Sequence, residues 1–149
     1  MTSKTERRIA VALLTMMLLT LKASAHEHKP PHSGTLVEFG KEFAHLELVL
    51  DPATGALSAY ALDGEAEKPV RIKQPEIEIA ITGVKDLPSI TVKAQASDLS
   101  GETVGDTSEF KATSEKLKGV KNFDGVVKVI TIRGTEFKDV KFNFPKGNE

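Results

Sequence analysis

The chain has 149 residues, with 20 lysines and arginines, 21 aspartates and glutamates, and no cysteine. The absence of cysteine excludes thiol redox chemistry, thiolate metal sites and iron–sulfur clusters. Any metal ion must therefore be held by nitrogen or oxygen ligands.

The first 25 residues have the three parts of a cleavable secretory signal peptide. A basic start precedes an apolar run over residues 9–21, and Ala23-Ser24-Ala25 gives the small-x-small pattern of a cleavage site. The run is shorter than the ~20 apolar residues that a spanning helix needs, and an uncleaved anchor helix is the alternative. We expect an exported, periplasmic protein with no membrane insertion after cleavage.

Cleavage after Ala25 changes the charge of the chain. The signal peptide holds four basic residues and one acidic residue, namely Lys4, Arg7, Arg8, Lys22 and Glu6. The mature chain of 124 residues then keeps 16 basic and 20 acidic residues, a net charge of −4 with neutral histidine. This acidic balance argues against nucleic acid and anionic lipid as partners, because both select clustered lysine and arginine.

Residues 26–34, HEHKPPHSG, hold three of the four histidines of the chain. The segment has two prolines and almost no apolar side chain, so we expect a flexible or extended arm. The remaining residues, 35–149, have the length of one domain with its own hydrophobic core.

Period-two alternation of apolar and polar residues, separated by turn residues, predicts β-strands along this domain. The predicted strands cover residues 42–50, 56–62, 76–82, 89–96, 126–133 and 137–144. The first two strands should form a hairpin around the turn at 51–55, and the last two a hairpin around Gly134-Thr135. A loop is expected over Ser97–Asp106, and one helical turn after Ser114. The pattern indicates an all-β fold, an antiparallel β-sandwich of about six to eight short strands.

The predicted cut gives the arm a candidate metal site. With His26 at the new N-terminus, the free amine, two backbone amides and the imidazole of His28 supply four nitrogens in a square plane. Cu(II) and Ni(II) prefer that geometry. The imidazole of His26 forms a second chelate with its own amine, and His32 offers a third imidazole. Copper is the favoured ion because it stands highest in the affinity order of divalent ions, and nickel and zinc are the alternatives. The competing interpretation is that these histidines are incidental and solvated.

The fourth histidine, His45, lies in a predicted strand on the face opposite Leu46 and Leu48. Glu47 shares that face two residues further on, within reach of one ion. The pair could supply two ligands to a site completed by His32 or the arm. An ordinary exposed strand face is the alternative interpretation.

Motifs of enzymes are largely missing from the sequence. The arm does not match the metalloprotease helix, because Pro30 stands where that motif needs its second histidine. There is no nucleophile elbow or glycine-rich phosphate loop. An N-terminal histidine on a β-sandwich resembles the copper histidine brace of oxidative polysaccharide enzymes. Those enzymes need an aromatic binding surface, whereas this chain has no tryptophan and a single tyrosine, Tyr60. We expect no catalytic residues.

Pro31-His32-Ser33-Gly34 resembles the Pro-His-Gly-Gly opening of small periplasmic proteins and of the N-terminal regions of heavy-metal efflux adaptors of the RND type. The following segment, up to Ile81, is similar to the strand and hairpin of that family. The resemblance implies a periplasmic domain in heavy-metal handling, with His32 and His45 at family histidine positions. Ser33 replaces a glycine of the motif, and Glu65 stands where some relatives are expected to carry histidine. The adaptor's helical hairpin and lipoyl-like segments are missing, so the chain is expected to be a free-standing relative.

Two functions therefore follow from the sequence. The first is a periplasmic heavy-metal binding protein, accessory to metal efflux or homeostasis, with a component of an efflux system as a possible partner. Its expected ligands are His26, His28, His32, His45 and Glu47. The second is a non-catalytic β-sandwich interaction module with incidental histidines.

Overall fold

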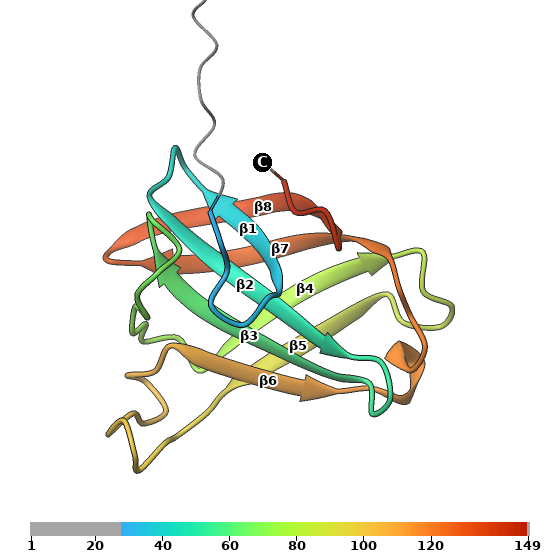
Figure 1. Cartoon of the computed structure of the whole chain (residues 1–149), viewed down its shortest axis with the longest axis horizontal. Coiled ribbons are helices and arrows are strands. Elements are labelled where there is room, and N and C mark those ends of the chain that lie inside the picture. The colour runs from blue at the N-terminus through green and yellow to red at the C-terminus, as the bar shows by residue number, and fades with distance from the viewer. Residues whose placement is uncertain (1–27, 149) are drawn as a thin grey trace, which may run out of the picture.

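The structure is a computed structural model that describes residues 28–148, so the predicted signal peptide and His26 lie outside the described residues. It contains eight strands and one short 3-10 helix (Figure 1). These are β1 (Thr35–Phe39), β2 (Ala44–Asp51), β3 (Ala56–Asp63), β4 (Glu76–Thr82), β5 (Ser89–Ala94), β6 (Glu109–Thr113), η1 (Glu115–Leu117), β7 (Phe123–Ile132) and β8 (Thr135–Phe144). Within residues 28–148, no helix is long and apolar enough to cross a bilayer.

All eight strands belong to one antiparallel sheet in the order β1-β2-β3-β6-β5-β4-β7-β8. The sheet curls until its two end strands, β1 and β8, approach each other (Figure 1). The gap is bridged after β8, where the Asn148 side chain accepts from Glu38 N at 2.7 Å and donates to Glu38 O at 3.2 Å. The predicted antiparallel all-β fold is confirmed, and its two layers are the halves of one nearly closed sheet.

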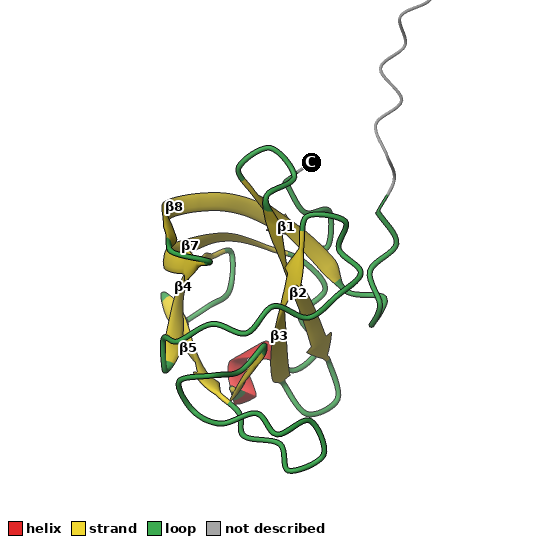
Figure 2. Cartoon of the chain, turned by 90° about the vertical axis from the view of Figure 1, so that its left-hand side faces the viewer, coloured by secondary structure: helices red, strands yellow, loops and turns green. Residues whose placement is uncertain are grey.

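The core lies between these halves. Figure 2 shows β1, β2 and β3 facing β4, β5, β7 and β8 across the interior. Large side chains from both halves are fully buried there, including Phe39, Leu46, Ile79, Phe110 and Ile130. Alternate residues of β2 point into this core, as its period-two pattern predicts.

Both predicted hairpins form. Asp51 begins the turn between β2 and β3, where its Oδ1 accepts from Ala53 N at 2.9 Å and its carbonyl accepts from Gly55 N at 2.8 Å. Gly55 has φ +74°, a backbone conformation that favours glycine. Arg133 and Gly134, both with positive φ, connect β7 to β8. The helical turn after Ser114 is also present, with the Ser114 side chain accepting from Lys116 N.

Two strands, β1 and β6, were not predicted. Each has only five residues. In β1 four of the five side chains are buried, so the alternation that identifies a half-exposed strand is missing. β6 follows a polar loop whose end carries no clear turn signal.

Candidate metal centre

The outer face of β2 and β3 is not exposed, although it points away from the main core. His45 and Glu47 on this face are both 0% exposed. The arm covers them from one side, and the blue segment before β1 passes over β2 in Figure 1. The loop over residues 63–69, which we call the covering loop, lies beside the same face. The interpretation of this surface as an ordinary exposed strand face is therefore wrong.

Glu47 anchors the arm to β2. Its Oε1 accepts hydrogen bonds from His32 N and Gly34 N, both at 2.8 Å. Its Oε2 accepts from His32 Nδ1, also at 2.8 Å. Because both carboxylate oxygens accept hydrogen bonds from the arm, Glu47 fixes the position of residues 32–34.

The ring of His32 is fixed by a second contact as well. It stacks on Tyr60 of β3, with ring centroids 3.9 Å apart and an interplanar angle of 13°. A pocket of about 390 Å3 is lined by both rings of this stack, and Ser100, Glu102 and Ser108 line it as well. The arm is thus held by one buried carboxylate and one aromatic face.

His28 and His45 come together beneath the arm, with ring centroids 5.0 Å apart and an interplanar angle of 57°. His28 Nδ1 lies 3.2 Å from the carbonyl oxygen of Glu65, and His45 Nδ1 lies 3.1 Å from that of Asp63. A carbonyl oxygen only accepts hydrogen bonds, so Nδ1 carries the proton in both rings. When the ring of His28 is neutral, its lone pair is then on Nε2.

This pattern is typical of metal-binding histidines. Such histidines almost always donate their second ring N–H to a carbonyl or carboxylate, which fixes the tautomer and the ring orientation. Here two neighbouring histidines do so to two carbonyls of the same covering loop. Imidazole nitrogen is a good ligand for zinc, copper and nickel.

The Nε2 atom of His28 is buried and has no hydrogen-bond partner within the described part of the chain. The His28 side chain as a whole is only 7% exposed. Glu42 Oε1 lies 3.6 Å from this nitrogen, beyond hydrogen-bond distance. A buried polar atom without a partner is unfavourable by about 1–3 kcal/mol.

The covering loop is itself fixed, which keeps the two carbonyl acceptors in place. Asp63 Oδ1 accepts from Glu67 N at 2.9 Å and from Lys68 N at 3.1 Å. Partial burial raises the pKa of Asp63, but these two bonds and the charge of Lys68 lower it more, so its pKa lies below the usual value. Asp63 is therefore ionised at neutral pH and holds the loop through charge-assisted bonds.

The loop also packs tightly against the turn between β1 and β2. A Cβ atom added at Gly64 would lie 2.1 Å from the carbonyl oxygen of Glu42, so only glycine fits there. Glu42 has φ +52°, and its N–H donates to Glu38 Oε1 at 2.6 Å. The turn that carries Glu42 is thus locked against the loop that orients both histidines.

The residues predicted as ligands separate into two pairs. His28 lies with His45, and His32 lies with Glu47, while His26 is outside the described residues. Within residues 28–148, no three histidine, aspartate or glutamate side chains already converge as metal ligands. The approach of Glu42 to His28 was not predicted, because nothing in the sequence pattern shows that its turn packs beside the arm.

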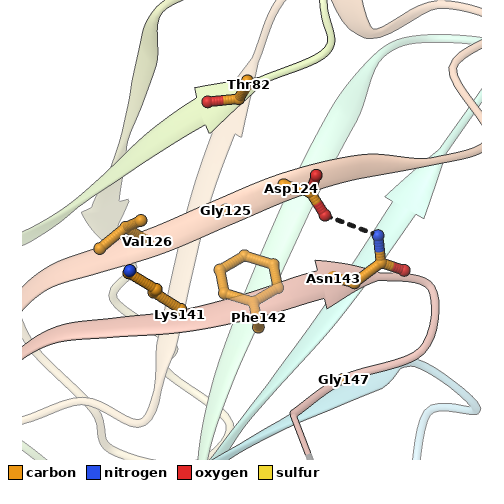
Figure 3. A pocket seen from close by; sticks show the side chains of 8 residues that line it. All are labelled: Thr82, Asp124, Gly125, Val126, Lys141, Phe142, Asn143 and Gly147. Atoms are coloured by element: carbon orange, nitrogen blue, oxygen red, sulfur yellow. Dashed lines mark hydrogen bonds between the residues drawn. The ribbon is translucent and has the colours of Figure 1, made fainter.

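Another pocket, of about 360 Å3, lies where β4, β7 and β8 meet (Figure 3). The ring of Phe142 lies against Gly125, and Asp124 accepts from Asn143 at 2.8 Å. No histidine lines this pocket, and its one carboxylate is already paired. It carries no arrangement comparable to the histidine pair.

Comparisons with protein-family models, with curated proteins and with solved structures found no match to this chain.

Proposed function

We propose that the mature chain is a periplasmic protein that binds a divalent transition-metal ion, in the service of heavy-metal homeostasis or efflux. The observation that carries this proposal is the His28–His45 pair, in which both Nδ1 atoms are committed to carbonyl oxygens. The acidic net charge of the mature chain favours a cation over an anionic partner. A component of an efflux system is the proposed recipient of the ion.

Two coordination modes compete for His28. In the amino-terminal chelate predicted for Cu(II), the ion is bound by the backbone nitrogen of His28 and by its Nδ1. Nδ1 is the ring nitrogen nearer to the backbone. In the docked arm that atom donates to Glu65. A centre shared with His45 uses Nε2 instead. The ion therefore binds either at the folded histidine pair or at the free amino terminus.

Metal binding itself is tested with the tag-free mature chain, titrated with Zn(II) and with Cu(II) by calorimetry. We expect one ion per chain, and loss of that binding in His28→Asn. Asparagine places its amide nitrogen close to the Nδ1 position, so the bond to Glu65 is retained while the ligand atom is lost. Stoichiometric binding that is unchanged in His28→Asn would contradict the proposal, as would the absence of binding in the parent chain.

One observation favours an interaction module as the second candidate. Leu99 is fully exposed and Val104 is 62% exposed, both on the loop between β5 and β6. Arg71 holds this loop, with Nη1 donating to Asp106 at 3.0 Å and Nη2 to Ser100 O at 2.5 Å. Exposed apolar side chains that form a contiguous patch are typical of protein contact sites. A mature chain that binds neither ion in the titration would leave this candidate as the better one.

A further inference from the structure

We propose that a small cavity beside the turn between β7 and β8 binds a small oxyanion of the phosphate class, held by Lys73 and Arg133. The cavity has a volume of about 230 Å3, below the ~300–1,000 Å3 of pockets for drug-sized molecules. It is lined by two stretches of chain, within residues 71–74 and residues 131–134. The proposal goes beyond the metal ion and does not depend on it.

The charge of the cavity lining is opposite to that of the chain. The charged residues that line it are all basic, namely Arg71, Lys73 and Arg133, and no carboxylate among residues 28–148 lines it. The predicted mature chain, by contrast, has a net charge of −4. A concave site lined by one sign of charge attracts ions of the opposite sign, so this cavity favours an anion.

Two of the three basic side chains lack a carboxylate partner. Arg71 Nη1 already donates to Asp106 at 3.0 Å. Lys73 and Arg133 form no ion pair with another residue of the described part of the chain, and the charge of Arg133 acts on Asp63 only from beyond ion-pair distance. A phosphate group carries a charge of about −1.5 to −2 at pH 7, which matches these two unpaired cations.

Gln74 joins the two stretches that form the cavity. Its Oε1 accepts from Thr131 N at 2.8 Å, and its Nε2 donates to Glu76 O at 2.9 Å and to Val129 O at 3.3 Å. These bonds extend the contact between β4 and β7 past the start of β4. The backbone of Lys73, the neighbour of Gln74, is therefore fixed beside β7, and the site needs little reorganisation to accept an ion.

Arg133 occupies a backbone position that favours other residue types. Arg133 and Gly134 form the two-residue turn between β7 and β8, with φ values of +50° and +82° (Figure 1). Asparagine, aspartate or glycine is preferred where both φ values are positive, because arginine has no short polar side chain to bond the local backbone. Unfavourable backbone conformations gather at functional sites. Here the turn places beside the cavity a guanidinium group, whose paired N–H donors match the oxygens of a phosphate.

The test is an NMR titration of the mature chain with inorganic phosphate at constant ionic strength, with chloride as the reference salt. We expect saturable shifts of the backbone amide signals of residues 71–74 and 131–134. Arg133→Asn removes the guanidinium and suits the turn better, so the fold should keep its stability while phosphate affinity falls by about tenfold or more. Lys73→Gln should weaken binding to a similar extent. Lys121→Gln makes the same change at an exposed site away from the cavity and should leave the affinity unchanged.

A second titration, with glycerol phosphate, distinguishes the two sources of such a group. Tighter binding of this monoester would identify a phosphorylated small molecule as the ligand, and equal or weaker binding would identify the free ion. Shifts that do not saturate, that chloride produces equally, or that are unchanged in either Arg133→Asn or Lys73→Gln would overturn the inference. His28→Asn should leave phosphate binding unchanged, so a failure of the metal proposal and a failure of this one are separate results.

Discussion

Replacing Glu47 by glutamine is expected to release the arm from β2 and to weaken Zn(II) binding as a consequence. The carboxylate accepts three hydrogen bonds, from His32 N, His32 Nδ1 and Gly34 N, and is 0% exposed. Glutamine keeps one acceptor oxygen and turns an NH2 group toward a donor. Each buried donor left without an acceptor costs about 1–3 kcal/mol. We expect the free energy of unfolding, measured in urea, to fall by about that amount or more.

The effect on the metal follows from the position of the arm. Once residues 32–34 are released, His28 is no longer held beside His45, and we expect Zn(II) affinity to fall by about tenfold, as when an outer-shell contact is lost. Glu76→Gln is the control, because it makes the same change at an exposed site of β4 and should alter stability by less than about 0.5 kcal/mol. Unchanged stability and unchanged affinity in Glu47→Gln would show that Glu47 does not anchor the arm.

Replacing His45 by asparagine is expected to weaken Zn(II) binding at the His28–His45 pair while the fold persists. The asparagine amide lies where Nδ1 does and keeps a donor for the Asp63 carbonyl, which now accepts at 3.1 Å. Only the Nε2 side of the ring is lost. We expect Zn(II) affinity to fall by about 100-fold, the upper range for changes around metal ligands.

The same variant should leave the amino-terminal chelate intact, because His45 takes no part in it. Cu(II) titration of His45→Asn should therefore still give one square-planar ion per chain once the arm is released. A His45→Asn chain that binds Zn(II) as tightly as the parent would show that His45 is not a ligand.

The hairpins and strands were predictable because local chemistry determines them. The turn at residues 51–55 has its proline, aspartate and glycine in the sequence, and β4 alternates cleanly between Glu76 and Thr82. β1 was not predictable in this way, because most of its side chains are buried and alternation is lost. The closure of the sheet was not predictable either, since it depends on contacts such as Asn148 with Glu38, 110 residues apart.

The sequence predicted which residues belong to the candidate site, but not how they are arranged. The alternation of β2 correctly placed His45 and Glu47 on one face, but it did not show that the arm covers that face. The division into His28 with His45 and His32 with Glu47 depends on where the arm docks. The approach of Glu42 to His28 was not predictable, because it depends on the packing of Gly64 against the Glu42 carbonyl in the folded chain.

Nitrogen NMR of the histidine rings in the mature chain, above the pH at which imidazole is protonated and before and after one equivalent of Zn(II), tests most directly whether His28 and His45 bind the ion. We predict that both rings are Nδ1–H tautomers without the ion, and that both Nε2 signals shift when Zn(II) is added. Coupling of the ion to His28 Nδ1, or no change at the His45 ring, would contradict it.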